Sequence, residues 1–157
     1  MLEICEKRNP ELYLNIDSSI EYLNRLNYDN FTYPKETIFH TYTEIKNVYE
    51  LQSIRSFLAT QNLDKTKLIL WSDYDITNNK LIDPYKEYID MRVYKPEEIA
   101  KDTILEGQKI ILNSKDKKHW LQSDLLRLLA LHKFGGIWID MDVVLLRDFK
   151  PILDQEF

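Results

Sequence analysis

The chain has 157 residues, a formal net charge of −5, and 44% hydrophobic and 30% charged residues, a composition typical of one folded domain and not of a disordered segment. The acidic balance excludes general nucleic-acid binding, which depends on contacts from Lys and Arg to phosphates. Cys5 is the single cysteine, so an intramolecular disulfide and a Cys-based zinc cluster are also excluded.

The sequence contains no long apolar run and very little glycine. No stretch of about 18 apolar residues is present, so we expect no transmembrane segment. The N-terminus lacks the apolar core of a secretory signal, and we expect a cytoplasmic protein. The only glycines are Gly107, Gly135 and Gly136. Walker-type and GxGxxG nucleotide sites need glycine-rich loops, so the sequence excludes both.

Helical and strand patterns alternate along the first two thirds of the chain. Helically spaced apolar residues predict an N-terminal helical segment within residues 1–33 and a second helix over 46–60. Short β-rich or apolar runs predict strands, with bounds of 37–42, 67–71 and about 91–94.

Two prolines and a glycine pair mark the boundaries of the remaining elements. We expect a short helix after Pro84 and a helix that Pro96 opens and that runs to about Leu105. Residues 119–134 carry the strongest helical pattern, which ends at Gly135-Gly136. The apolar residues 137–139 then predict the last strand.

This alternation indicates an α/β fold with a mainly parallel sheet flanked by helices. In such sheets, ligands bind beyond the carboxyl ends of the strands. That rule brings together the strand ends at 40–43, 71–75 and 140–142.

Asp140 and Asp142 directly follow the last predicted strand. In an extended chain, residues i and i+2 point to the same side, so both carboxylates would face one place. Two close carboxylates repel each other unless a cation lies between them. Their oxygens suit Mg²⁺ or Mn²⁺, which would in turn hold a diphosphate. The alternative is a polar strand end with two solvated aspartates.

Asp124 and Arg127 are neighbours on one face of the strongest predicted helix. Leucines surround them, so we expect the pair to be at least partly buried, where charges need partners. They form either a structural ion pair or part of the site that holds the two aspartates.

Three sequence blocks resemble a known family. SDLLRLLALHKFGGIWIDMDVVLL at 123–146 resembles the signature of the DXD-containing sugar transferases of glycosyltransferase family 32, and it is similar to the glucosylating clostridial toxins, which have the GT-A fold. IFHTY at 38–42 and LILWSD at 68–73 resemble the first two strands of that fold. The resemblance covers roughly residues 36–150 and implies a GT-A-like, Rossmann-like core.

The resemblance implies an activity and a cofactor. It implies transfer of a sugar from a nucleotide-sugar donor, with a UDP-sugar more expected than a GDP-sugar. It also implies retention at the anomeric carbon and a divalent ion, Mn²⁺ or Mg²⁺. The acceptor, whether glycan, protein or lipid, is left open.

The resemblance also implies roles for single residues. Asp142 would be a metal ligand, and Asp140 would contact the ribose and the donor sugar and reach the metal through water. Asp124 and Arg127 would hold the sugar hydroxyls, which makes Asp124, Arg127 and Asp140 the catalytic candidates. The strand ends supply the other donor-binding candidates: His40, Thr41, Tyr42, Thr43, Trp71 and Asp73. Tyr42 and Thr43 would lie near the base, whereas a buried histidine at position 40 and a core tryptophan at position 71 are the structural alternatives.

The domain organisation follows from the same resemblance. We expect a single domain over 1–157, with the helical segment at 1–33 and the nucleotide-sugar-binding core at 36–150. GT-A transferases normally continue beyond the DxD with an acceptor-binding half, so we expect this chain to be the donor-binding part alone.

Two other functions remain open. A non-catalytic module could retain the donor site without turnover. The segment IWIDMDVVLL also resembles the first motif of haloacid-dehalogenase phosphatases, in which Asp140 would be the nucleophile and Asp142 the general acid. That motif belongs near an N-terminus with a lysine and an acidic site downstream, which makes the phosphatase the weaker alternative.

Overall fold

The computed structural model describes residue 33 and residues 36–114 and 120–153. The chain divides into one unit over 1–32 and a second over 33–157, and everything below concerns the second. The helical segment predicted within 1–33 lies outside the described residues, apart from Tyr33.

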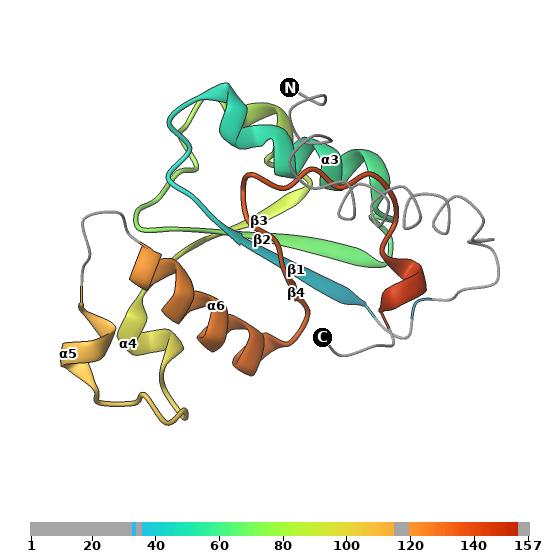
Figure 1. Ribbon diagram of the computed structural model, residues 1–157. Coiled ribbons are helices and arrows are strands. Elements are labelled where there is room, and N and C mark those ends of the chain that lie inside the picture. The colour runs from blue at the N-terminus through green and yellow to red at the C-terminus, as the bar shows by residue number, and fades with distance from the viewer. Residues whose placement is uncertain (1–32, 34–35, 115–119, 154–157) are drawn as a thin grey trace, which may run out of the picture. The chain divides into compact units, whose positions relative to one another are not determined.

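Four strands form one parallel sheet in the order β3-β2-β1-β4 (Figure 1). The strands are β1 (Thr37–Tyr42), β2 (Thr66–Ser72), β3 (Ile89–Val93) and β4 (Ile137–Trp138). The register pairs Tyr42 with Trp71 and His40 with Trp138. The predicted α/β class with a parallel, GT-A-like sheet is therefore confirmed, and the sheet places the carboxyl ends of β1, β2 and β4 along one edge.

Helices cover both faces of the sheet (Figure 1). A short 3-10 helix (Val48–Leu51) leads into α3 (Gln52–Thr60), which buries Ile54 and Phe57 against Phe39 of β1. The opposite face carries α4 (Pro96–Ile99), α5 (Lys109–Leu112) and α6 (Trp120–Phe134). There Leu126 and Leu129 of α6 belong to a second core cluster that also contains Trp71. No helix in the described ranges is both long and apolar enough to cross a membrane.

The region after Pro96 differs from the sequence prediction. The helix that Pro96 opens ends at Ile99, and Asp102 adopts a left-handed backbone conformation with φ of 64°. Such a residue cannot continue a right-handed helix, so the prediction of a helix to Leu105 is wrong. The one-turn α5 was not predicted, and the helix expected after Pro84 is a 3-10 turn over Asp83–Tyr85.

Candidate functional site

The connection from α6 to β4 rests directly on β1. Gly135 and Gly136 both have left-handed backbone conformations, with φ of 65° and 95°. The amide of Gly135 donates to Leu131 O at 2.9 Å and so ends the helix. A Cβ atom on Gly136 would lie 2.0 Å from Ile38 O, so only glycine fits there. The glycine pair therefore acts both as a helix cap and as the contact that brings β4 alongside β1.

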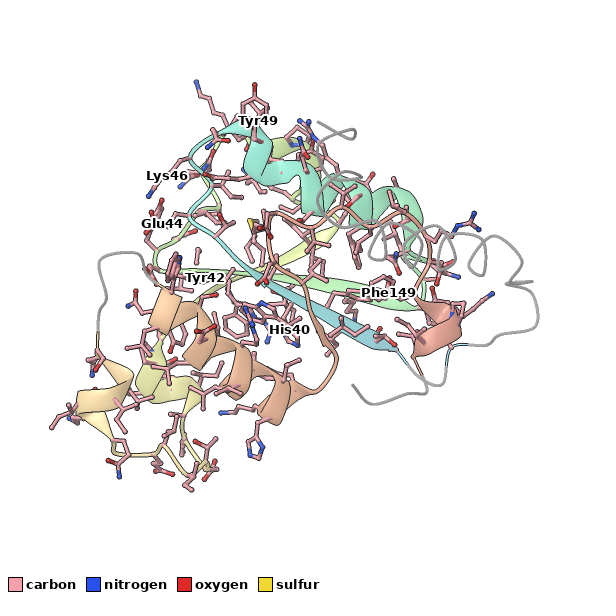
Figure 2. All side chains as sticks on the ribbon, in the orientation of Figure 1. His40, Tyr42, Glu44, Lys46, Tyr49 and Phe149 are labelled. Atoms are coloured by element: carbon pink, nitrogen blue, oxygen red, sulfur yellow. The ribbon has the colours of Figure 1, made fainter. Side chains whose placement is uncertain are left out.

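His40 of β1 forms a hydrogen bond that holds this connection in place. Its Nδ1 accepts a hydrogen bond from Trp71 Nε1 at 3.2 Å, so its Nε2 carries the proton and donates to Gly135 O at 2.9 Å. The side chain is fully buried, and burial lowers the pKa of His40, with the positive charge of Arg92 acting in the same direction. Figure 2 shows His40 between β1 and α6. Because both ring nitrogens bond to the protein, His40 is held neutral as a structural partner of Gly135.

The chain turns immediately after β4. The amide of Ile139 still donates to His40 O at 2.8 Å, but the amide of Val143 donates back to Asp140 O at 3.1 Å. Asp140 to Val143 therefore form a turn, and the expected extended geometry of the two aspartates is wrong. The rule that residues i and i+2 of a strand share a side does not apply to them.

One oxygen of Asp140 is held by two donors. Asp140 Oδ1 accepts from Arg127 Nη2 at 2.9 Å and from Trp138 Nε1 at 2.8 Å. The Arg127 guanidinium also lies over the Trp138 ring, 5.4 Å from its centroid. The side chain of Asp140 is about half exposed. Its orientation is thus fixed through one oxygen, while the carboxylate stays open to solvent.

Asp124 lies at the rim of the same group. Its carboxylate is 3.8 Å from Arg127 Nη2, and the side chains are 64% and 38% exposed respectively. The expected burial therefore holds for Arg127 and is wrong for Asp124. Trp120 and Leu128, four residues to either side of Asp124, are also exposed, because no described element covers that face of α6. Arg127 Nε is buried and lacks a hydrogen-bond partner in the described part of the chain.

Asp142 differs from Asp140 in having no partner among the described residues. It is exposed, and no hydrogen bond or ion pair from a described residue reaches its carboxylate. The described residues contain no group of three or more His, Cys, Asp or Glu side chains that could hold a metal. Mg²⁺ and chemically similar ions are commonly bound by one or two carboxylates together with substrate phosphates. The free carboxylate of Asp142 fits that mode of binding and not a closed metal cage.

A family model described as "glycosyltransferase sugar-binding region containing DXD motif" matches residues 48–157, more than two thirds of the chain. The chain belongs to this family. No solved structure matches it. Membership supports a nucleotide-sugar-binding role of the glycosyltransferase type, and the matched range contains α6, β4 and the DxD turn.

The remaining candidates in this DXD glycosyltransferase domain lie on β1 and β2 or directly after them. Tyr42 and Tyr94 meet edge to face with ring centroids 6.5 Å apart. Burial raises the pKa of both hydroxyls, to about 12 for Tyr94, and the negative charge of Asp73 contributes in each case. Asp73 and Tyr42 therefore form one group, at the carboxyl ends of β2 and β1, together with Tyr94, which the sequence did not single out.

The other three candidates are engaged within the protein or buried. Thr41 is fully buried, and its hydroxyl has no hydrogen-bond partner in the described ranges. Thr43 Oγ1 accepts from the amide of Ile45 at 3.1 Å. Trp71 is buried and lines a cavity of about 460 Å³ with Arg92 and Phe134, and no residue of the DxD turn lines that cavity. Trp71 thus packs as a core residue beside His40.

Two side chains that hold the DxD turn were missed in the sequence. Trp138 orients Asp140, and its place two residues before the first aspartate was the available signal. Ser53 of α3 is fully buried, and its hydroxyl lies 2.9 Å from Asp140 O. Ser53 and Ser56 are polar residues at helical spacing among apolar ones, a pattern that marks a face with polar partners.

Proposed function

We propose that this chain is the donor-binding part of a retaining, metal-dependent glycosyltransferase that uses a UDP-sugar. We further place it in glycosyltransferase family 32, with similarity to the catalytic domain of the glucosylating clostridial toxins. One observation supports the proposal most: within the DXD domain, Arg127 and Trp138 orient Asp140, while Asp142 in the same turn is exposed and has no partner in the described part of the chain.

In this proposal Asp142 is the protein's main metal ligand. The carboxylate is exposed in a turn, so it can reach an ion that is also bound to a diphosphate. A bound Mn²⁺ or Mg²⁺ would neutralise the charge that develops on the diphosphate as it leaves. In the same proposal, the second carboxylate oxygen of Asp140 binds either the ion through water or the ribose and sugar hydroxyls.

Arg127 and Asp124 are proposed to hold the donor sugar. The rim position of Asp124 leaves its carboxylate open to sugar hydroxyls, and Arg127 places a cation beside Asp140, close to where charge develops on the leaving group.

The nucleotide base is proposed to lie near Tyr42, Thr43 and Asp73. Tyr42 and Asp73 already form one group at the carboxyl ends of adjacent strands, where ligands bind in open α/β sheets. His40, Thr41 and Trp71 support this edge from within the protein and do not need to touch the donor.

Calorimetric titration of the full chain tests the proposal. UDP and GDP would each be titrated with Mn²⁺ and, separately, with EDTA. We expect UDP to bind in the presence of Mn²⁺ and to lose most of its affinity in EDTA. Equal binding in EDTA would exclude the metal-bridged mode, and a preference for GDP would change the assigned base.

Turnover distinguishes an enzyme from a binding module. Incubation with UDP-sugars and Mn²⁺ would be followed by release of UDP, through hydrolysis or transfer. Release that is lost in Asp142→Asn supports a transferase. Binding of UDP without any release would favour the non-catalytic module.

A further inference from the structure

Helix α3 and its C-cap residue Gln61 carry a row of polar side chains that holds the chain segment following β4. Ser56 Oγ accepts from the amide of Leu145 at 2.9 Å, and the side-chain amide of Gln61 donates to Arg147 O at 2.8 Å and accepts from the amide of Phe149 at 3.0 Å. The segment after the DxD thus runs along a helix and bonds to its side chains.

Ser53 is the member of this row that meets the DxD turn itself. It is fully buried, and its hydroxyl lies 2.9 Å from Asp140 O and also within hydrogen-bonding distance of Val143 O. These are the carbonyls of the first and last residues of the turn. A hydroxyl has one proton, so Ser53 donates to one of them at a time and lies between both.

We propose that Ser53 is a positioning residue for the DxD turn. By bridging the carbonyls of Asp140 and Val143, it fixes the turn that presents both aspartates, although it lies 87 residues from Asp140 in the sequence. It touches no ligand and acts through the backbone. The effect on metal and donor binding rests on the function proposed above, whereas the effect on the turn does not.

Arg127 and Trp138 hold the side chain of Asp140, whereas Ser53 is the described residue outside the turn that bonds to the turn's backbone. Strand β4 pairs with β1 through only two residues, and the turn's own hydrogen bond is the single one from Val143 N to Asp140 O. The carboxylate of Asp142 receives no bond from the described residues that would fix it from outside. The position of Asp142 therefore depends on the backbone of the turn, and hence on the hydroxyl of Ser53.

The first experiment needs neither metal nor donor. Hydrogen exchange at single amides would be compared in the metal-free chain, in Ser53→Ala and in Ser56→Ala as the matched control. We expect Ser53→Ala to speed exchange at the Val143 amide by about fivefold, as expected from the loss of one hydrogen bond. Ser56→Ala should instead speed exchange at Leu145. Unchanged exchange at Val143 in Ser53→Ala would overturn the proposal.

The second experiment measures Mn²⁺-dependent binding of UDP to the same variants. Removing a group that orients a metal ligand typically weakens metal affinity by about 10–100-fold. We expect a loss in this range for Ser53→Ala and little change for Ser56→Ala. If the parent chain binds UDP and Ser53→Ala binds it equally well, the positioning role is wrong. If the parent chain binds no UDP, the proposed function fails, and exchange at Val143 still decides the role of Ser53.

A third variant tests the proposal if the Ser53→Ala chain does not fold. Ser53→Cys keeps nearly the same size but donates only weakly. With thermal unfolding measured in parallel, faster exchange at Val143 at an unchanged melting temperature supports the proposal. Parent-like exchange at Val143 in a folded Ser53→Cys chain would contradict it.

Discussion

Strands β1 and β4 lie side by side, yet they present their key side chains in opposite ways. On β1, His40 is fully buried with both ring nitrogens bound to the protein. Beyond β4, Asp142 is exposed and has no partner among the described residues. The comparison shows two kinds of polar side chain at neighbouring strands: a buried one that bonds only to the protein, and an exposed one whose carboxylate is the ligand-binding group in the function proposed above.

The largest effect on ligand binding is expected from a change to the exposed carboxylate of Asp142. Asp142→Asn should abolish Mn²⁺-dependent UDP binding, because it removes the charge of the proposed metal ligand. Since the side chain is exposed, the free energy of unfolding should change by less than about 0.5 kcal/mol. Calorimetric titration and urea denaturation measure the two quantities. UDP binding that survives undiminished would remove Asp142 from the site.

Among changes to the buried contacts with β1, Gly136→Ala should have the largest effect on the free energy of unfolding. The added Cβ meets Ile38 O, and the left-handed backbone disfavours alanine as well, so we expect a loss of about 3 kcal/mol. Gly135→Ala is the matched control, because its Cβ would meet nothing within 4 Å, and it should cost only about 1 kcal/mol. Equal losses in urea denaturation would show that contact with β1 does not distinguish the two glycines.

The buried histidine predicts a pH dependence. Burial lowers the pKa of His40 in the folded chain, so the unfolded chain binds the extra proton first. The contribution of His40 to the free energy of unfolding is therefore fully present above the ordinary histidine pKa of about 6.5, and it is lost as the pH falls below that value. Urea midpoints measured from pH 7.5 to 5.5 should fall, and the fall should be smaller in His40→Gln. The same slope in both chains would assign the effect to other groups.

The smallest effect is expected at Trp138, which pairs with His40 of β1 in the sheet and donates a hydrogen bond to Asp140. Trp138→Phe keeps a ring beneath Arg127 but removes the hydrogen bond to Asp140 Oδ1. One such bond is worth about 1 kcal/mol, so Mn²⁺-dependent UDP affinity should fall about fivefold. Trp120→Phe on the exposed face of α6 serves as the control. An unchanged affinity in Trp138→Phe would show that Arg127 alone orients Asp140.

The sequence predicted those parts of the fold that local patterns determine. The run 37–42 forms β1 within its predicted bounds, and the leucine-rich helix forms α6 up to the glycine pair. These elements have strong periodicity and an unambiguous stop signal. The predicted length of the helix that begins at Pro96 was wrong, because no apolar face holds residues 101–105 in a helix and Asp102 turns the chain instead.

The sequence supplied the candidate residues of the site but not their geometry. The sequence pattern singled out Asp140 and Asp142 but predicted an extended backbone for them. Hydropathy cannot reveal a turn whose carbonyls bond to a side chain of a distant helix. Ser53 and Trp138 went unnoticed for the same reason, since their roles depend on partners that only the fold brings near. Asp124 was expected to be partly buried because its neighbours are leucines, although part of that helix face is exposed.

The short strand β4 has a consequence for the order of folding. Its contacts close very long loops: His40 to Gly135 spans 95 residues and Ser53 to Asp140 spans 87. Contacts of such high sequence separation form late, because the entropy of loop closure must be met before they add stability. Strand β4 has only two residues paired with β1, so these long-range contacts are an important part of its attachment. We therefore expect the DxD end of the sheet to be the last part to fold and the first to open, while β1, β2 and β3 stay paired.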